Sequence, residues 1–231
     1  MKLSTLGLIG ALAAGLATIT PAKADVIITF GQTADVNTIT GVASATGTAW
    51  SGSDIAVTIT QIGPAGGPTP IAAFLDVSAS SISGANTAII GPVTFITQRF
   101  AGTFSINSLA DGSGVNYLSG TFSDGALTAE GAVQMVVAAP DVTFISDVIL
   151  ALGEPNALGF SFTNMAPPVS LTACTISGNP GCDTGQTIAS FTASVAGNAA
   201  AAVPEPATMA LLGAGLLGLG LTRRRKERIA A

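Results

Sequence analysis

The two cysteines of the chain, Cys174 and Cys182, are the residues whose type and spacing point most directly to chemistry. Catalytic redox cysteines have two residues between them and often lie at a helix N-terminus that lowers the thiol pKa. Here the intervening TISGNPG is longer and contains turn-forming residues that can bring its ends together. In an oxidising compartment, this spacing predicts a structural disulfide rather than a redox pair, worth about 2.5 kcal/mol in the chain-entropy model.

Histidine is absent from the sequence, and this excludes several classes of enzyme site. Ser-His-Asp and Cys-His catalysis and histidine-based zinc sites are impossible, and two cysteines alone cannot build a structural zinc site. No lysine lies between Lys23 and Lys226, which removes a Ser-Lys dyad and Schiff-base chemistry from that span. We therefore expect no catalytic residue, no metal site and no cofactor, and a protein that is not an enzyme.

The acidic side chains leave one enzymatic alternative open, which is a hydrolase that uses a pair of carboxylates. From Asp25 to Val203 the chain has eleven acidic residues and one basic residue, Arg99, and so a net charge of −10. The acids follow no shared motif, so we expect a solvated acidic surface, with Arg99 in a salt bridge to a nearby aspartate. A surface this negative repels phosphate backbones, which excludes nucleic acid as a partner.

Two further binding motifs can be examined on short stretches. DGSGVN, residues 111–116, has the first acidic position of an EF-hand loop, but valine at the fifth position and no glutamate at the twelfth predict a plain turn. An ice-binding surface would need a flat, regular array of threonines. TIT occurs at 38–40 and 58–60 without a repeating period, so ice binding stays the weakest alternative.

Residues 1–24 have the three parts of a secretory signal peptide. Lys2 supplies the positive charge, residues 6–19 are apolar, and Pro21 precedes a small-x-small cleavage site. As a helix the apolar stretch would extend about 21 Å, short for a hydrocarbon core of about 30 Å, which disfavours a permanent anchor. We predict export and cleavage by signal peptidase, with Ala22, Ala24 and Asp25 at the cleavage site.

Residues 203–231 combine a Pro-Glu-Pro box, an uncharged stretch and a basic cluster. The box is Pro204, Glu205 and Pro206, and the uncharged residues 207–222 would span about 24 Å as a helix. Snorkelling arginines and local bilayer thinning can accommodate that length as a transmembrane helix. Lys and Arg near a membrane segment set its orientation, so the basic cluster is predicted to be cytoplasmic. This cluster consists of Arg223, Arg224, Arg225, Lys226 and Arg228.

This three-part order resembles the PEP-CTERM sorting signal of Gram-negative bacteria, also called the ice-binding protein C-terminal domain. The resemblance covers about 29 of the 231 residues and rests on the Pro-Glu-Pro box, the apolar stretch to Leu221 and the arginines. It implies a transient inner-membrane anchor and recognition of Pro204, Glu205 and Pro206 by an exosortase, a membrane cysteine transpeptidase that processes the chain there. It further implies a final location at the cell surface or outside the cell, together with exopolysaccharide export and biofilm or floc formation.

Residues 25–195 are predicted to form one secreted all-β domain, an antiparallel sandwich-like fold flanked by helices in the two terminal segments. Short segments rich in Thr, Val, Ile and Phe are separated by Gly and Pro turns. In IAVTITQI, residues Ile55, Val57 and Ile59 share one face, and GFSFTN and ASFTASV alternate in the same way. The following residues 196–202, AGNAAAA, are predicted to be a flexible linker that holds the domain off the membrane.

A local repeat predicts one hairpin within this domain. GTFS occurs at 102–105 and again at 120–123, and DGSG lies between the two copies as a strong turn signal. Phe104 and Phe122 should then lie on adjacent strands, close to facing each other. Residues 126–139 are compatible with a helix by composition, but Gly131 and the valines favour a bulged strand.

Targeting and composition together predict an exported surface or extracellular-matrix protein, structural or adhesive and in contact with exopolysaccharide. Its other expected partners are signal peptidase, the exosortase and, through the C-terminal helix, the membrane. Two alternatives stay open, a secreted hydrolase with carboxylate-only catalysis and an ice-binding protein. A cleft with two convergent carboxylates would favour the hydrolase, and a closed sandwich with acids spread over its surface would favour the structural protein.

Overall fold

The computed structural model consists almost entirely of antiparallel strands, and it describes residues 24–33, 38–63, 70–130, 132–149, 152–176 and 178–202. Within these residues the helical structure is one short 3-10 turn, η1. The elements are β1 Ala24–Gln32, β2 Ile39–Ser44, β3 Gly47–Ile62, β4 Ile71–Ser81, β5 Asn86–Ile90, β6 Val93–Asn107, β7 Asn116–Glu130, β8 Ala132–Ala138, β9 Val142–Ile145, β10 Gly153–Ala166, β11 Leu171–Ala173, η1 Pro180–Cys182, β12 Gln186–Ile188 and β13 Phe191–Ala202.

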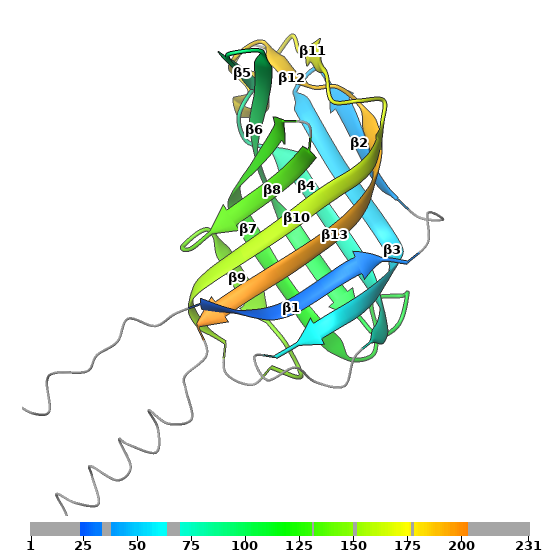
Figure 1. Cartoon of the computed structure of the whole chain (residues 1–231). Coiled ribbons are helices and arrows are strands. Elements are labelled where there is room, and N and C mark those ends of the chain that lie inside the picture. Colours follow the sequence, from blue (N-terminus) through cyan, green and yellow to red (C-terminus); the bar gives the residue numbers. More distant parts are fainter. Residues whose placement is uncertain are drawn as a thin grey trace, which may run out of the picture.

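Eleven of the strands form one antiparallel sheet that curls and closes on itself (Figure 1). The strand order is β5-β6-β4-β3-β1-β13-β10-β8-β7-β9, and a further pairing of β6 with β7 joins the two sides. Strand β2 pairs with both β3 and β13, and β11 with β12 forms a separate two-stranded sheet. Closure gives each strand around the circuit a hydrogen-bonded neighbour on both sides, so the sheet needs no protected edge there.

The prediction of an all-β antiparallel domain is confirmed. The two layers expected of a sandwich are opposite walls of the single closed sheet, which encloses the core between them. The predicted terminal helices fall in residues 1–23 and 203–231 and lie outside the described residues. The alternation of apolar and polar residues was the correct signal. Strand β3 directs Ile55, Val57 and Ile59 toward the core, where they are almost fully buried.

The interior is filled by aromatic side chains around Trp50, which is 1% exposed. Its ring lies edge-on to Phe162, with centroids 5.4 Å apart, and to Phe100 and Phe160, with centroids 6.2 Å apart. Phe122 stacks on the same indole at 6.5 Å. Such pairs add about 0.5–1.5 kcal/mol each beyond the burial of their area, so the closed sheet surrounds a packed aromatic core.

The prediction of a flexible linker at residues 196–202 is wrong, because these residues form the second half of β13. They pair with β1 on one side and with β10 on the other, in registers such as Phe30↔Gly197 and Phe160↔Gly197. The rings of Phe30 and Phe160 meet edge-to-face with centroids 6.2 Å apart. A Cβ at Gly197 would lie 2.6 Å from the Phe30 ring, so the small residues of β13 make room for bulky neighbours.

The hairpin predicted from the GTFS repeat is confirmed, since β6 and β7 pair along most of their length. Phe104 lies opposite Gly120, and Phe122 lies opposite Gly102, so both rings point into the core from adjacent strands. The helix alternative for residues 126–139 is wrong, and so is the single bulged strand. The stretch belongs to two strands, the end of β7 and all of β8, which pair as a hairpin.

Candidate functional site

The chain enters and leaves the closed sheet at the same end of the molecule. Ala24, the first residue of β1, pairs with Ala202, the last residue of β13, and Ala202 also pairs with Gly153 at the start of β10 (Figure 1). Of the predicted cleavage residues, Ala24 and Asp25 therefore open β1, whereas Ala22 lies outside the described residues. The first and last described residues of the domain therefore lie side by side at this end.

The residues predicted for sorting and orientation lie outside the described part of the chain. They are Pro204, Glu205 and Pro206, followed by Arg223, Arg224, Arg225, Lys226 and Arg228. The last described residue, Ala202, is buried within the sheet and stands two positions before the Pro-Glu-Pro box. The box thus follows the folded domain without a spacer of the length that the predicted linker would have supplied.

The opposite end of the domain carries the predicted disulfide. Cys174 and Cys182 are bonded, with an S–S distance of 2.00 Å and Cα atoms 5.8 Å apart, within the usual range for a bridge. The loop between them ends in η1, where the Asn179 side chain accepts a hydrogen bond from the Gly181 N–H at 3.0 Å. Both sulfurs are buried, so the bridge fixes a small cap formed by this loop with β11 and β12.

A buried polar cluster joins this cap to the sheet, and it was missed in the sequence. The Gln98 amide donates to Ser83 O and to Thr187 Oγ1, both at 2.9 Å, and its oxygen accepts from Ile188 N–H at 3.0 Å. Thr48 hydrogen bonds Thr187 Oγ1 at 2.6 Å and donates to the carbonyl of Ile188. Single Gln and Thr residues that lie far apart in the sequence follow no motif, so the sequence could not predict that they would meet in one cluster. The cluster satisfies its buried polar groups mutually and has a positioning role.

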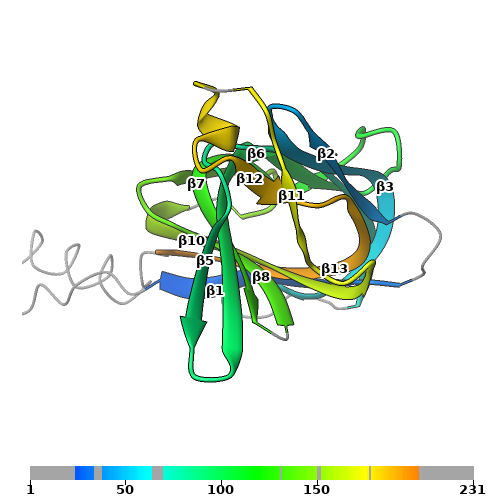
Figure 2. The same ribbon diagram turned by 90° about the horizontal axis from the view of Figure 1, so that it is seen from above.

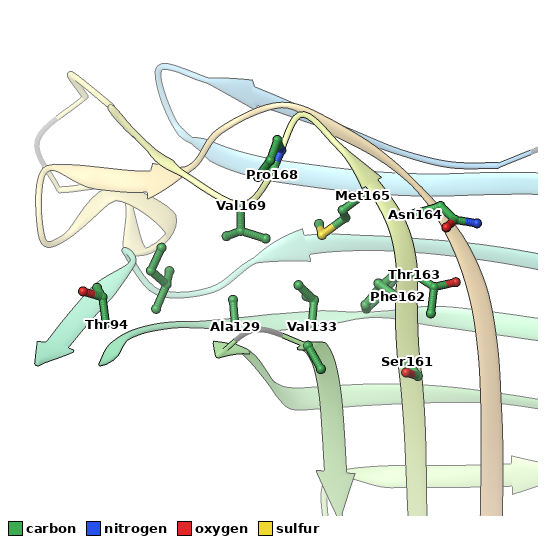
Figure 3. A pocket seen from close by; sticks show the side chains of 12 residues that line it. Thr94, Ala129, Val133, Ser161, Phe162, Thr163, Asn164, Met165, Pro168 and Val169 are labelled. Atoms are coloured by element: carbon green, nitrogen blue, oxygen red, sulfur yellow. The ribbon is translucent and has the colours of Figure 1, made fainter. Parts of the chain in front are cut away.

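A pocket of about 680 Å³ opens beside the cap, at the mouth of the closed sheet (Figure 3). The wall formed by β10 and the following loop contributes Met165 and Val169, which face Ala129 and Val133 of the β7–β8 hairpin across the opening. Thr94 of β6 lines another side of the opening. Since β10 begins beside Ala202 and reaches this mouth only near its C-terminal end, the pocket lies opposite the end where the chain enters and leaves.

The lining of this pocket is uncharged and mostly apolar. Its other lining residues are Ile96, Ala132, Ser161, Phe162, Thr163, Asn164 and Pro168, and the amide of Asn164 points away from the opening (Figure 3). A second, smaller pocket of about 430 Å³ lies across β1, β13, β10 and β8. Neither pocket has a carboxylate among its described lining residues, so neither supplies the pair that glycoside hydrolysis needs.

The charged residues of the domain are dispersed over the surface. Arg99 forms a salt bridge with Asp124, as predicted, and both side chains are partly exposed. In the part of the chain that the structure describes, no three acidic or cysteine side chains gather as a metal site would require. The Arg99–Asp124 pair is exposed, and exposed ion pairs add about 0–1 kcal/mol to the free energy of unfolding.

The predicted turn at DGSG is confirmed between β6 and β7. Asp111 accepts hydrogen bonds from the Ser113 hydroxyl and from the Ser113 N–H, the latter at 3.0 Å. These two bonds, the side-chain one first, hold the pKa of the Asp111 carboxyl below its ordinary value of 3.8. Gly112 and Gly114 have φ of 73° and 82°, which glycine adopts without strain. The Asp111 carboxylate therefore stabilises the turn in which it lies.

Residues 202–226 match the family model of the PEP-CTERM protein-sorting motif. The chain carries a PEP-CTERM motif. The resemblance found in the sequence is thus confirmed, and the match begins at the last residue of β13. A PEP-CTERM motif implies an exported protein that is processed by an exosortase and sorted to the cell surface. No curated protein and no solved structure matches the chain. No helix among the described residues is long and apolar enough to cross a membrane.

Proposed function

We propose that the protein is a structural or adhesive component of the cell surface or extracellular matrix of a Gram-negative bacterium, in contact with exopolysaccharide. The observation that carries this proposal is the PEP-CTERM motif placed directly after a closed β domain. The motif supplies export and sorting, and the domain is the part that remains to act once sorting is complete.

The arrangement of the two ends supports a transient membrane-anchored stage. The C-terminal segment would serve as an inner-membrane helix with its five-residue basic cluster in the cytoplasm. Exosortase would then act at the box formed by Pro204, Glu205 and Pro206. Because β13 ends beside the start of β1, the anchored domain would present its opposite end, with the cap and the apolar pocket, away from the membrane.

A non-enzymatic role is supported by the character of the domain. Its interior is occupied by aromatic rings around Trp50, and its described pockets have no carboxylate in their walls. Its acidic side chains are spread over strands and turns rather than directed toward one cleft. These features suit a stable surface module that acts through its outer faces.

A gene deletion with complementation tests the proposal. Loss of the protein should reduce biofilm or floc mass, and the wild-type gene should restore it. The variant Pro204→Ala/Pro206→Ala should accumulate as an uncut, membrane-associated chain and should fail to restore the matrix. Pro70→Ala, which changes an exposed proline outside the motif, is the matched control and should be processed and function as the wild type.

Three results would contradict parts of the proposal. An unchanged mature mass in the Pro204→Ala/Pro206→Ala variant would show that the box is not recognised. Release of reducing sugars from purified exopolysaccharide by the processed protein would assign it to the hydrolases instead. Normal processing together with an unaltered matrix in the deletion strain would remove the structural role while leaving the sorting intact.

A further inference from the structure

The β5–β6 hairpin projects from the closed sheet beyond its neighbours (Figure 2). Among the described residues, β5 pairs with β6 alone. The first residues of β6 have no other partner either, since its pairing with β7 extends only to Ile96 and its pairing with β4 only to Phe100. The tip is a two-residue turn of Gly91, with φ of 61°, and Pro92. Both backbone edges of the hairpin tip are therefore open.

The side chains of this hairpin are uncharged, and two exposed isoleucines lie at its tip. All five residues of β5 are exposed, with Ile89 at 77% and Ile90 at 65%. Natural proteins guard open edges with charges, above all lysine, or with bulges. Here no charged residue occurs between Asp76 and Arg99, and the regular β5–β6 register has no bulge. An unguarded apolar edge of this kind is a template for association with another chain.

Charge favours a second copy of this chain as the occupant. With eleven acidic residues and one basic residue from Asp25 to Val203, two copies repel each other over most of their surfaces. The paired hairpin residues 86–97 and the described lining of the mouth pocket contain no charged side chain. Repulsion between the acidic surfaces of two copies thus favours a dimer in which the hairpin of one copy meets the pocket of the other.

The position of the pocket lets one contact serve both copies. Thr94 and Ile96 of β6 line the pocket, and the same strand continues into the projecting tip (Figure 3). A two-fold axis between tip and pocket places each tip at the pocket of the other copy, which is the self-complementary contact of closed dimers. We propose that the processed protein forms such a dimer, with the Ile89–Ile90 tip of each copy seated in the apolar pocket of its partner.

Sedimentation equilibrium of the processed protein, purified from exporting cells, tests this dimer. The wild type should show a monomer–dimer equilibrium, and Ile89→Asp should raise its dissociation constant by about tenfold or more. Val169→Asp, which places the charge in the pocket wall, should have the same effect. Ile145→Asp is the matched control, because Ile145 is an equally exposed isoleucine, at 67%, on β9, and this variant should dimerise as the wild type does.

Cross-linking in the exporting cells tests the geometry. Two differently tagged full-length chains, one with Ile90→Cys and one with Ala132→Cys, should form a mixed disulfide only when they are produced together. Exchanging Ile90→Cys for Ile145→Cys should abolish that product. A disulfide between two Ile90→Cys chains with no mixed product would mean that the tips meet each other, which overturns their seating in the pocket.

Other outcomes would also overturn the proposal. A processed wild-type protein that stays monomeric up to about 1 mM, the weak end of specific affinity, has no such interface. Equal weakening of the dimer by Ile145→Asp and Ile89→Asp would show that association is not specific to the hairpin. If the monomer floats with phosphatidylethanolamine–phosphatidylglycerol vesicles and Ile89→Asp prevents this, the hairpin serves a lipid surface instead.

Discussion

The bridge between Cys174 and Cys182 holds a cap that lies outside the strand pairing of the large sheet. The cap has one short strand pair, β11 with β12. It contacts the sheet through the buried polar cluster at Gln98 and through bonds such as Thr175 N–H to the carbonyl of Ala45 at 3.2 Å. The aromatic core around Trp50, in contrast, does not depend on the cap for its strand pairing. Single residues thus have separable effects on the cap and on the core.

Replacement of both cysteines by serine should lower the free energy of unfolding by about 2–3 kcal/mol, because the open chain gains loop entropy when it unfolds. Urea unfolding followed by Trp50 fluorescence measures this change. The near-ultraviolet circular dichroism should keep its native form, since the indole environment lies within the closed sheet. The reduced wild type is the control and should match the double variant. Equal stability of the variant and the oxidised wild type would contradict a stabilising role for the bridge.

Among the elements, β13 is the one that sequence composition describes worst. Its second half consists of Ala, Gly and Asn, residues typical of a linker, yet it is paired on both sides. The physical reason is volume, because the ring of Phe30 on the neighbouring strand occupies the space over Gly197. Gly197 is paired with a phenylalanine on each neighbouring strand, and only this pairing, which the sequence does not show, gives the glycine its structural role.

Gly197→Ala should therefore destabilise the domain by about 1–3 kcal/mol, the usual cost of overpacking a core. The added Cβ would lie 2.6 Å from the Phe30 ring and 2.7 Å from the carbonyl oxygen of Gly159, and the backbone atom cannot move aside alone. Thermal unfolding measures the loss. Asn198→Ala, an exposed position on the same strand, is the control and should unfold near the wild-type temperature. A linker would tolerate both changes equally.

Alternation and turn signals predicted the local parts of the fold correctly. Ile55, Val57 and Ile59 face the core, and DGSG joins the two strands that carry Phe104 and Phe122. Period-two alternation assigns side chains to a face but does not name the partner strand. Closure of the sheet depends on the pairing of β1 with β13, which lie far apart in the chain, and the pocket depends on that closure. Neither can be deduced from local patterns.

At the scale of the whole molecule, the described domain begins and ends at one place. Antiparallel neighbours such as Ala24 and Ala202 can be joined by a turn of two residues or slightly more. A circular permutant should therefore fold, with a short glycine linker from Ala202 to Ala24 and new ends between Gly112 and Ser113. Its near-ultraviolet circular dichroism should match the wild type, and its melting temperature should differ by only a few degrees.

A second permutant provides the contrast. New ends between Gly197 and Asn198 would interrupt a strand that is hydrogen bonded to neighbours on both sides. This chain should fail to give the native spectrum, although its composition is the same. If both permutants behave alike, the continuity of β13 is unimportant to the fold.

The place of β13 between β1 and β10 also sets the time at which the domain can mature during export. In translocation from the N-terminus, β1 would emerge first and would keep one side unpaired until β13 follows. The circuit closes only when Ala202 has crossed, which is the moment when residues 202–226, the matched motif, come next. Completion of folding and arrival of the sorting signal are thereby synchronised by topology. A chain that stalled before Phe191 would leave both β1 and β10 with open edges, and quality control could distinguish it from a finished molecule.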